Sequence, residues 1–130
     1  MRPHIARARG KIAVMGLGLG YYAYMASMKT CVESITVVES DPQVISLFQD
    51  HILPQFPYRE KLRICRDDAF DFARNSLPAG KYDYVFCDLW HDAADGMEMY
   101  LRMKALEPLS PATEFSYWIE DTLRCYLLNT

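Results

Sequence analysis

The sequence contains no apolar run of transmembrane length, and its start shows no signal-peptide pattern. It also carries little excess charge, since the formal net charge at pH 7 is −3. The basic cluster Met1–Lys11 is short, and we expect it to form a solvated arm or helix over residues 1–10. Nucleic-acid binding needs a broader basic face. We therefore expect a cytoplasmic protein that contacts neither a membrane nor nucleic acid.

Closely spaced cysteine pairs are missing as well. The four cysteines, Cys31, Cys65, Cys87 and Cys125, lie far apart and form no C-x-x-C motif. Structural zinc sites use such pairs, and disulfide frameworks belong to small secreted domains. We expect buried thiols in a reducing compartment, with no metal ligand among them.

What is present is the composition of one globular domain. The chain has 130 residues, of which 51% are hydrophobic and 24% charged. Apolar runs alternate with helical patterns, which predicts an α/β fold with a mostly parallel sheet. The predicted strands are Lys11–Met15, Ser34–Glu39, Leu62–Arg66, Tyr82–Asp88 and Glu114–Trp118. The predicted helices are Leu19–Lys29, a helix capped by Asp41 that begins at Pro42, Ala69–Ser76, Met97–Leu106 and Ile119–Leu128.

Helical spacing also predicts which side chains face the sheet. In the first long helix these are Tyr22, Met25, Ala26 and Met28. In Met97–Leu106 the stripe at i, i+3, i+4 and i+7 is Met97, Tyr100, Leu101 and Lys104. His4 and His51 stand alone in the sequence, and we expect both at the surface.

Three alternate glycines follow the first predicted strand. We expect Gly16 to leave the strand in a tight turn where a side chain would clash. Gly18 then permits a close backbone approach to a ligand, and Gly20 lets the next helix pack onto the strand. The N–H groups of such a loop favour a carboxylate or phosphate. The alternative is a glycine-rich turn that binds nothing.

The spacing of these glycines argues against a dinucleotide. The dinucleotide fingerprint Gly-x-Gly-x-x-Gly needs a glycine at position 21, where this chain has Tyr21. Glu39 ends the second predicted strand, and a carboxylate at that place favours a nucleoside-type ligand at the carboxyl ends of the strands.

Several motifs together resemble class I S-adenosylmethionine-dependent methyltransferases, and the closest resemblance is to the spermidine-synthase-like branch. They are Gly16-Leu17-Gly18-Leu19-Gly20, Val37–Asp41, Asp68-Ala69-Phe70 and Tyr82–Asp88, within residues 10–95. The resemblance implies a three-layer α/β/α Rossmann-like fold with strand order 3-2-1-4-5, lacking the usual last two strands. It implies that residues 1–130 form a single S-adenosylmethionine-binding domain, either a fragment of a longer protein or a domain whose partner fills the missing space.

The resemblance also implies a role for each matching residue. Gly16, Leu17, Gly18 and Gly20 would line the amino-acid end of S-adenosylmethionine. Glu39, with Ser40 beside it, would accept hydrogen bonds from the ribose hydroxyls. Asp68 would accept a hydrogen bond from the adenine amino group, and the Ala69 N–H would face a ring nitrogen of the adenine. Asp88 would lie beside the sulfonium and the acceptor, and Asp88 or His91 would take the acceptor's proton.

Each carboxylate also has a structural alternative. Asp68 can cap its helix, Glu39 can be a solvated strand end, and Asp88 can accept hydrogen bonds from nearby backbone N–H groups. Asp88, His91, Asp92 and Asp95 together suggest a divalent cation, but we favour a polar loop at the mouth of a cleft and predict no metal site.

The run Asp88-Leu89-Trp90-His91-Asp92 departs from the polyamine-synthase pattern, because its second Asp is displaced by one position and a Pro is missing. We therefore favour methyl transfer to a small molecule. The alternatives are an aminopropyltransferase that uses decarboxylated S-adenosylmethionine, a non-catalytic cofactor-binding or assembly module, and an NAD-binding protein. An exposed sheet edge near Glu114–Trp118 predicts a homodimer.

Overall fold

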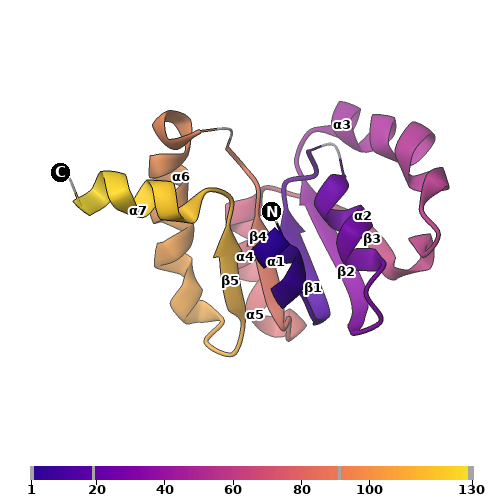
Figure 1. Cartoon of the computed structure of the whole chain (residues 1–130), viewed down its shortest axis with the longest axis horizontal. Helices are drawn as coiled ribbons and strands as arrows, with labels where there is room; N and C mark the ends of the chain where they lie inside the picture. The colour runs from indigo at the N-terminus through magenta and orange to yellow at the C-terminus, as the bar shows by residue number, and fades with distance from the viewer. Residues whose placement is uncertain (1, 19, 91, 129–130) are drawn as a thin grey trace.

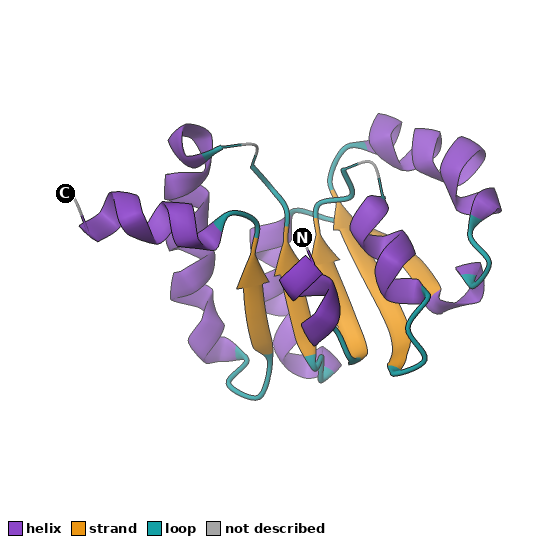
Figure 2. Cartoon of the chain, viewed as in Figure 1, coloured by secondary structure: helices purple, strands orange, loops and turns teal. Residues whose placement is uncertain are grey.

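The structure is a computed structural model that describes residues 2–18, 20–90 and 92–128. Its centre is a parallel sheet in the order β3-β2-β1-β4-β5, as the resemblance implied. Figure 1 labels the elements, and Figure 2 shows the strands side by side between helices. The strands are β1 (Gly10–Met15), β2 (Val32–Glu39), β3 (Leu62–Arg66), β4 (Tyr84–Cys87) and β5 (Glu114–Tyr117).

Helices cover both faces of the sheet and complete three layers (Figure 1). One face packs against α1 (Arg2–Arg7), α2 (Tyr21–Ser27) and α3 (Pro42–Leu47), which continues into a π-helical turn (Phe48–Ile52) and a 3-10 turn (Leu53–Gln55). The other face packs against α4 (Ala69–Asn75), α5 (Leu77–Gly80), α6 (Ala93–Leu106) and α7 (Glu120–Leu128). Further 3-10 turns are Arg59–Lys61 and Glu107–Leu109.

Strand β1 lies in the middle of the sheet and contributes side chains to both hydrophobic cores. Ile12 and Val14 point into the core under α1–α3, whereas Ala13 and Met15 point into the core under α4–α7. This alternation is the period of two that a strand imposes. The helix after β1 lies on one face, and the helices on either side of β4 in the chain lie on the other. The boundary between β1 and β4 is therefore the topological switch point, where α/β sheets bind ligands.

Local signals predicted the start of α3 correctly and the start of α6 wrongly. Asp41 caps α3 by accepting a 2.9 Å hydrogen bond from the Gln43 N–H, and Pro42 is the first helical residue. Helix α6 begins four residues before the predicted Met97, because Asp92 and Asp95 form a capping box. Each carboxylate accepts a hydrogen bond from the other's backbone N–H, at 3.1 and 3.0 Å. These two acids thus begin a helix instead of forming a polar loop.

Several predicted side-chain positions are also corrected. Met28 and Leu101 are 45% and 46% exposed, because the buried stripe of α2 includes Tyr22 and Ala26 and that of α6 is Gly96, Tyr100 and Met103. Of the four cysteines only Cys87 is buried; Cys65 is half-buried, and Cys31 and Cys125 are exposed thiols. His51 is at the surface as predicted, whereas His4 is half-buried, because its ring packs on Phe86.

The chain from α4 to β4 passes through the short helix α5. Among the described residues, no helix is both long enough and apolar enough to cross a bilayer.

Candidate functional site

A pocket of about 300 Å³ opens at the carboxyl ends of the strands, at the switch point between β1 and β4. We call it the glycine pocket. Seven of the nine predicted cofactor-binding residues line it, and they lie at or just after the carboxyl ends of four strands, β1 to β4. The lining residues are Gly16, Gly18, Glu39, Ser40, Asp68, Ala69, Phe70, Asp88, Leu89 and Met99.

Gly16 brings the ends of β1 and β4 into close contact. Its φ is +92°, and a Cβ added there would lie 2.3 Å from the backbone oxygen of Asp88. Gly18 also has a positive φ, +56°, but a Cβ there would lie 3.5 Å from Asp88 Oδ2, which is ordinary contact. The clash predicted at Gly16 is therefore confirmed, and the loop at Gly18 faces the pocket side of Asp88.

Leu17 and Gly20 do not line the pocket. Leu17 is buried, and its backbone N–H donates a 2.9 Å hydrogen bond to Glu39 Oε1. Gly20 was expected to allow α2 to pack onto the strand, but its closest neighbours are Phe48 and Ile52 of the π-helical turn. A Cβ at Gly20 would lie 2.6 Å from Phe48 Cε2. Gly20 thus permits contact between α2 and the segment after α3, a contact that the motif does not predict.

Glu39 lies at the end of β2 and joins two loops. Its Oε1 accepts the Leu17 N–H, and its Oε2 accepts the Asp41 N–H at 3.1 Å. The side chain is therefore an ordered part of the pocket wall and not a solvated strand end. A carboxylate has about four acceptor sites, so each oxygen retains capacity for one more donor.

Asp68 is the N-cap of α4, which was the structural alternative for this residue. Its Oδ1 accepts hydrogen bonds from Phe70 N–H at 2.9 Å and Asp71 N–H at 3.0 Å. The cap does not remove Asp68 from the pocket, which it lines together with Ala69. The Ala69 N–H belongs to the first residue of α4 and is not one of the two that Asp68 caps.

Asp88 follows β4 and is held in place by the sheet. Its backbone N–H donates a 2.8 Å hydrogen bond to the Met15 carbonyl, and its side chain is half-buried beside Gly18. Burial raises the pKa of the neighbouring Cys87 thiol well above its ordinary value, so that this group stays protonated at neutral pH. His91, the other predicted catalytic residue, lies outside the described residues.

Three lining residues were missed by sequence reasoning: Phe70, Leu89 and Met99. Phe70 and Leu89 each adjoin a predicted site residue, and that adjacency was a usable signal. Met99 lies inside α6, and nothing in its local sequence marks it. Among the described residues, no group of three or more histidine, cysteine, aspartate or glutamate side chains is placed to hold a metal ion.

No protein-family model and no curated protein matches this chain. Solved structures match its fold. Spermidine synthase from Thermotoga maritima is 17% identical with a TM-score of 0.58, and the match covers 88% of this chain and 39% of that one. A putative methyltransferase from Thermoplasma acidophilum is 22% identical with a TM-score of 0.55, covering 87% and 46%. A conserved hypothetical protein from Streptococcus pyogenes is 16% identical with a TM-score of 0.56, covering 77% and 61%.

These likenesses show the fold alone: a Rossmann-like α/β fold, which the resemblance implied and which this chain shares with the spermidine synthase and the putative methyltransferase. The chain spans between 39% and 61% of the length of the three proteins.

Gly16 and Gly18 both face Asp88, but they differ in how much a side chain at that position would destabilise the fold. We expect Gly16→Ala to lower the free energy of unfolding by at least about 3 kcal/mol, because a Cβ would meet rigid backbone at a positive φ. Gly18→Ala should cost about 1–2 kcal/mol, since it has left-handed strain without the clash. Urea denaturation of both variants measures the difference. Equal losses would contradict the close approach of Asp88 to Gly16.

Proposed function

We propose that this methyltransferase-like domain binds S-adenosylmethionine in the glycine pocket and transfers its methyl group to a small molecule. The observation that carries the proposal is the convergence of Gly16, Gly18, Glu39, Asp68 and Asp88 on one pocket at the switch point. These residues are spread over 73 positions of the chain, from 16 to 88, and only the sheet brings them together.

The residues present suit the parts of this cofactor. In the proposal Glu39 accepts the two ribose hydroxyls, using the acceptor capacity that its bonds to Leu17 and Asp41 leave. Asp68 and the Ala69 N–H meet the edge of the adenine at the start of α4. The main chain at Gly16 and Gly18, where no side chain intervenes, lies against the amino-acid end.

The cofactor supplies an electrophilic methyl group on a sulfonium. The contribution of this chain is to orient the acceptor towards that methyl group, and such positioning can supply several kcal/mol of the barrier. Asp88 is half-buried directly after β4, the strand next to the central β1, and in the proposal it takes the proton of an amine or hydroxyl acceptor, with His91 as the other candidate.

A second candidate, aminopropyl transfer, is favoured by one observation. The sequence of the glycine loop contains no acidic side chain, but in the fold the Asp88 carboxylate lies beside Gly18. A carboxylate at that place repels the carboxylate of S-adenosylmethionine and tolerates a decarboxylated cofactor better. The overall likeness to spermidine synthase agrees with this candidate but does not decide between the two.

Calorimetric titration of the whole chain tests both candidates. We expect binding of S-adenosylmethionine and S-adenosylhomocysteine, weaker binding of decarboxylated S-adenosylmethionine and none of NAD. If the decarboxylated cofactor binds more tightly, the result favours aminopropyl transfer over methyl transfer as the function of this domain.

Glu39→Gln should weaken S-adenosylmethionine binding by about ten- to a hundredfold, because hydrogen bonds to a charged acceptor are worth about 1.5–3 kcal/mol. Glu33→Gln is the matched control, since Glu33 lies exposed near the other end of β2. If the two variants bind S-adenosylmethionine with equal affinity, Glu39 is not part of the binding site.

Asp88→Asn tests the base. We expect cofactor affinity to stay within about threefold, while transfer of labelled methyl to a pooled small-molecule extract falls by at least about a hundredfold. The control is Asp50→Asn, at an exposed position outside the glycine pocket. If affinity and transfer fall equally, Asp88 is a binding residue and not the base.

We also propose that the chain forms a homodimer through the edge of β5. Within the described residues β5 pairs with β4 alone, and half-buried Phe115 and Trp118 lie at that edge. Unpaired strand edges tend to pair or to be covered. Light scattering should give twice the 15.0 kDa of one chain, and Phe115→Lys should shift the mass toward that of the monomer. A monomeric mass for the unmodified chain would contradict the dimer.

A further inference from the structure

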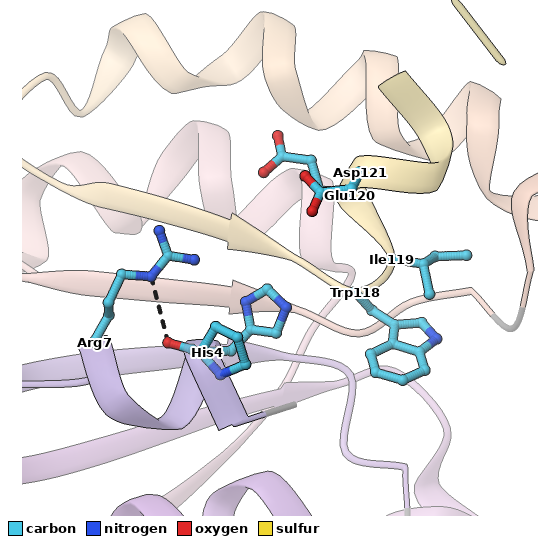
Figure 3. Close-up of a pocket in the computed structure, with 7 residues that line it drawn as sticks. His4, Arg7, Trp118, Ile119, Glu120 and Asp121 are labelled. Carbon is cyan, nitrogen blue, oxygen red and sulfur yellow. Dashed lines mark hydrogen bonds between the residues drawn. The ribbon is translucent and has the colours of Figure 1, made fainter. Parts of the chain in front are cut away.

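A second cavity, of about 270 Å³, lies between α1 and the turn that joins β5 to α7 (Figure 3). It shares no lining residue with the glycine pocket. This volume is just below the range of about 300–1,000 Å³ that is usual for ligand pockets, so the cavity has room only for a ligand of a few heavy atoms. We call it the α1–α7 cavity.

Charges of opposite sign face each other across this cavity. Arg7 projects from α1 on one side, and the carboxylates of Glu120 and Asp121 lie on the other, at the start of α7 (Figure 3). Arg7 has two weak contacts: Nε donates to the Pro3 carbonyl at 3.4 Å, and Nη1 lies 3.8 Å from Glu114 Oε2 at the surface. Contacts of this length and exposure constrain the guanidinium little.

The acidic side is better ordered. Glu120 Oε2 accepts hydrogen bonds from the Tyr100 hydroxyl at 2.8 Å and from Arg124 Nη2 at 3.3 Å. These partners orient the carboxylate and leave acceptor capacity on it. Ile119 has a φ of +52°, which is rare for a β-branched residue. The sharp turn at Ile119 lets Glu120 and Asp121 follow directly from the end of β5 to face α1.

Aromatic rings complete the wall. The His4 ring lies 4.9 Å from the Phe86 ring, centroid to centroid, and is hydrogen-bonded to Ser116. Burial lowers the pKa of His4, so its ring is neutral at pH 7. Trp118 is fixed at both backbone groups: its N–H donates to the Cys87 carbonyl at 3.0 Å, and its carbonyl accepts from the Trp90 indole at 2.9 Å.

We propose that the α1–α7 cavity binds a small zwitterion, with its ammonium at Glu120 and Asp121 and its carboxylate at Arg7. A simple anion would meet two carboxylates, and a simple amine would leave Arg7 with only its long contact to Glu114. A neutral apolar molecule would displace water from these charged groups and offer them no new partner. A molecule with both charges pairs with both sides of the cavity.

Calorimetry with four probes tests the charge requirement. The zwitterions are L-alanine, with its charges close together, and 5-aminopentanoate, with its charges far apart; butylamine and butanoate carry one charge each. We expect at least one zwitterion to bind, and each single-charge probe to bind at least about tenfold more weakly, because one charged hydrogen bond is worth about 1.5–3 kcal/mol. The proposal is overturned if neither zwitterion binds, or if butylamine or butanoate binds as well as the better zwitterion.

Two substitutions locate the binding. Arg7→Gln and Asp121→Asn should each lower the affinity for the zwitterion by about tenfold or more. The matched controls are Arg9→Gln, which alters another partner of Glu114 outside the cavity, and Asp50→Asn at a distant exposed position. Thermal unfolding of all four variants shows whether each is folded. Folded cavity variants that bind like the controls would overturn the assignment.

The Trp118 indole N–H signal in a nitrogen–proton correlation spectrum provides an independent readout. It should shift on addition of the zwitterion and not on addition of butanoate. These titrations contain no S-adenosylmethionine, so their outcome is separate from that of the function proposed for the glycine pocket.

Discussion

The close approach of the ends of β1 and β4 is the constraint on which this architecture depends. The Asp88 N–H bonds to the Met15 carbonyl, and the Asp88 carbonyl occupies the space that a side chain at Gly16 would need. With that contact in place, the chain after β1 and the chain after β4 leave towards opposite faces of the sheet. The glycine pocket is the gap that this divergence opens, and a bulkier residue at Gly16 would force the two strand ends apart.

The carboxylates around the gap serve the fold and remain available to a ligand. Glu39 ties the glycine loop to the start of α3, and Asp68 caps α4, yet both line the pocket. Glu39 and Asp68 can therefore have a structural role and a binding role at the same time. One carboxylate oxygen can accept a backbone N–H and still present a lone pair to the pocket. The backbone bonds also hold each side chain in place before any ligand arrives, which lowers the entropic cost of binding.

The two cavities are neighbours because parallel strands end at one edge of the sheet. Cys87 of β4 is in register with Tyr117 of β5, so Asp88 and Trp118 follow from adjacent positions. Asp88 lines the glycine pocket and Trp118 lines the α1–α7 cavity. The sheet brings together polar residues that are far apart in the sequence.

The sequence alone determined the five strands, the glycine loop and the acidic strand ends, since period-two patterns, turn glycines and caps act between residues near in the chain. It also contained the Asp92–Asp95 capping box, which we overlooked in favour of a cluster of acids. Only the tertiary structure decided that Gly20 faces Phe48 and that His4 lies on Phe86. Those contacts join residues 28 and 82 positions apart. Such pairs are determined by how elements pack on a face of the sheet, and the sequence near each residue does not indicate its partner.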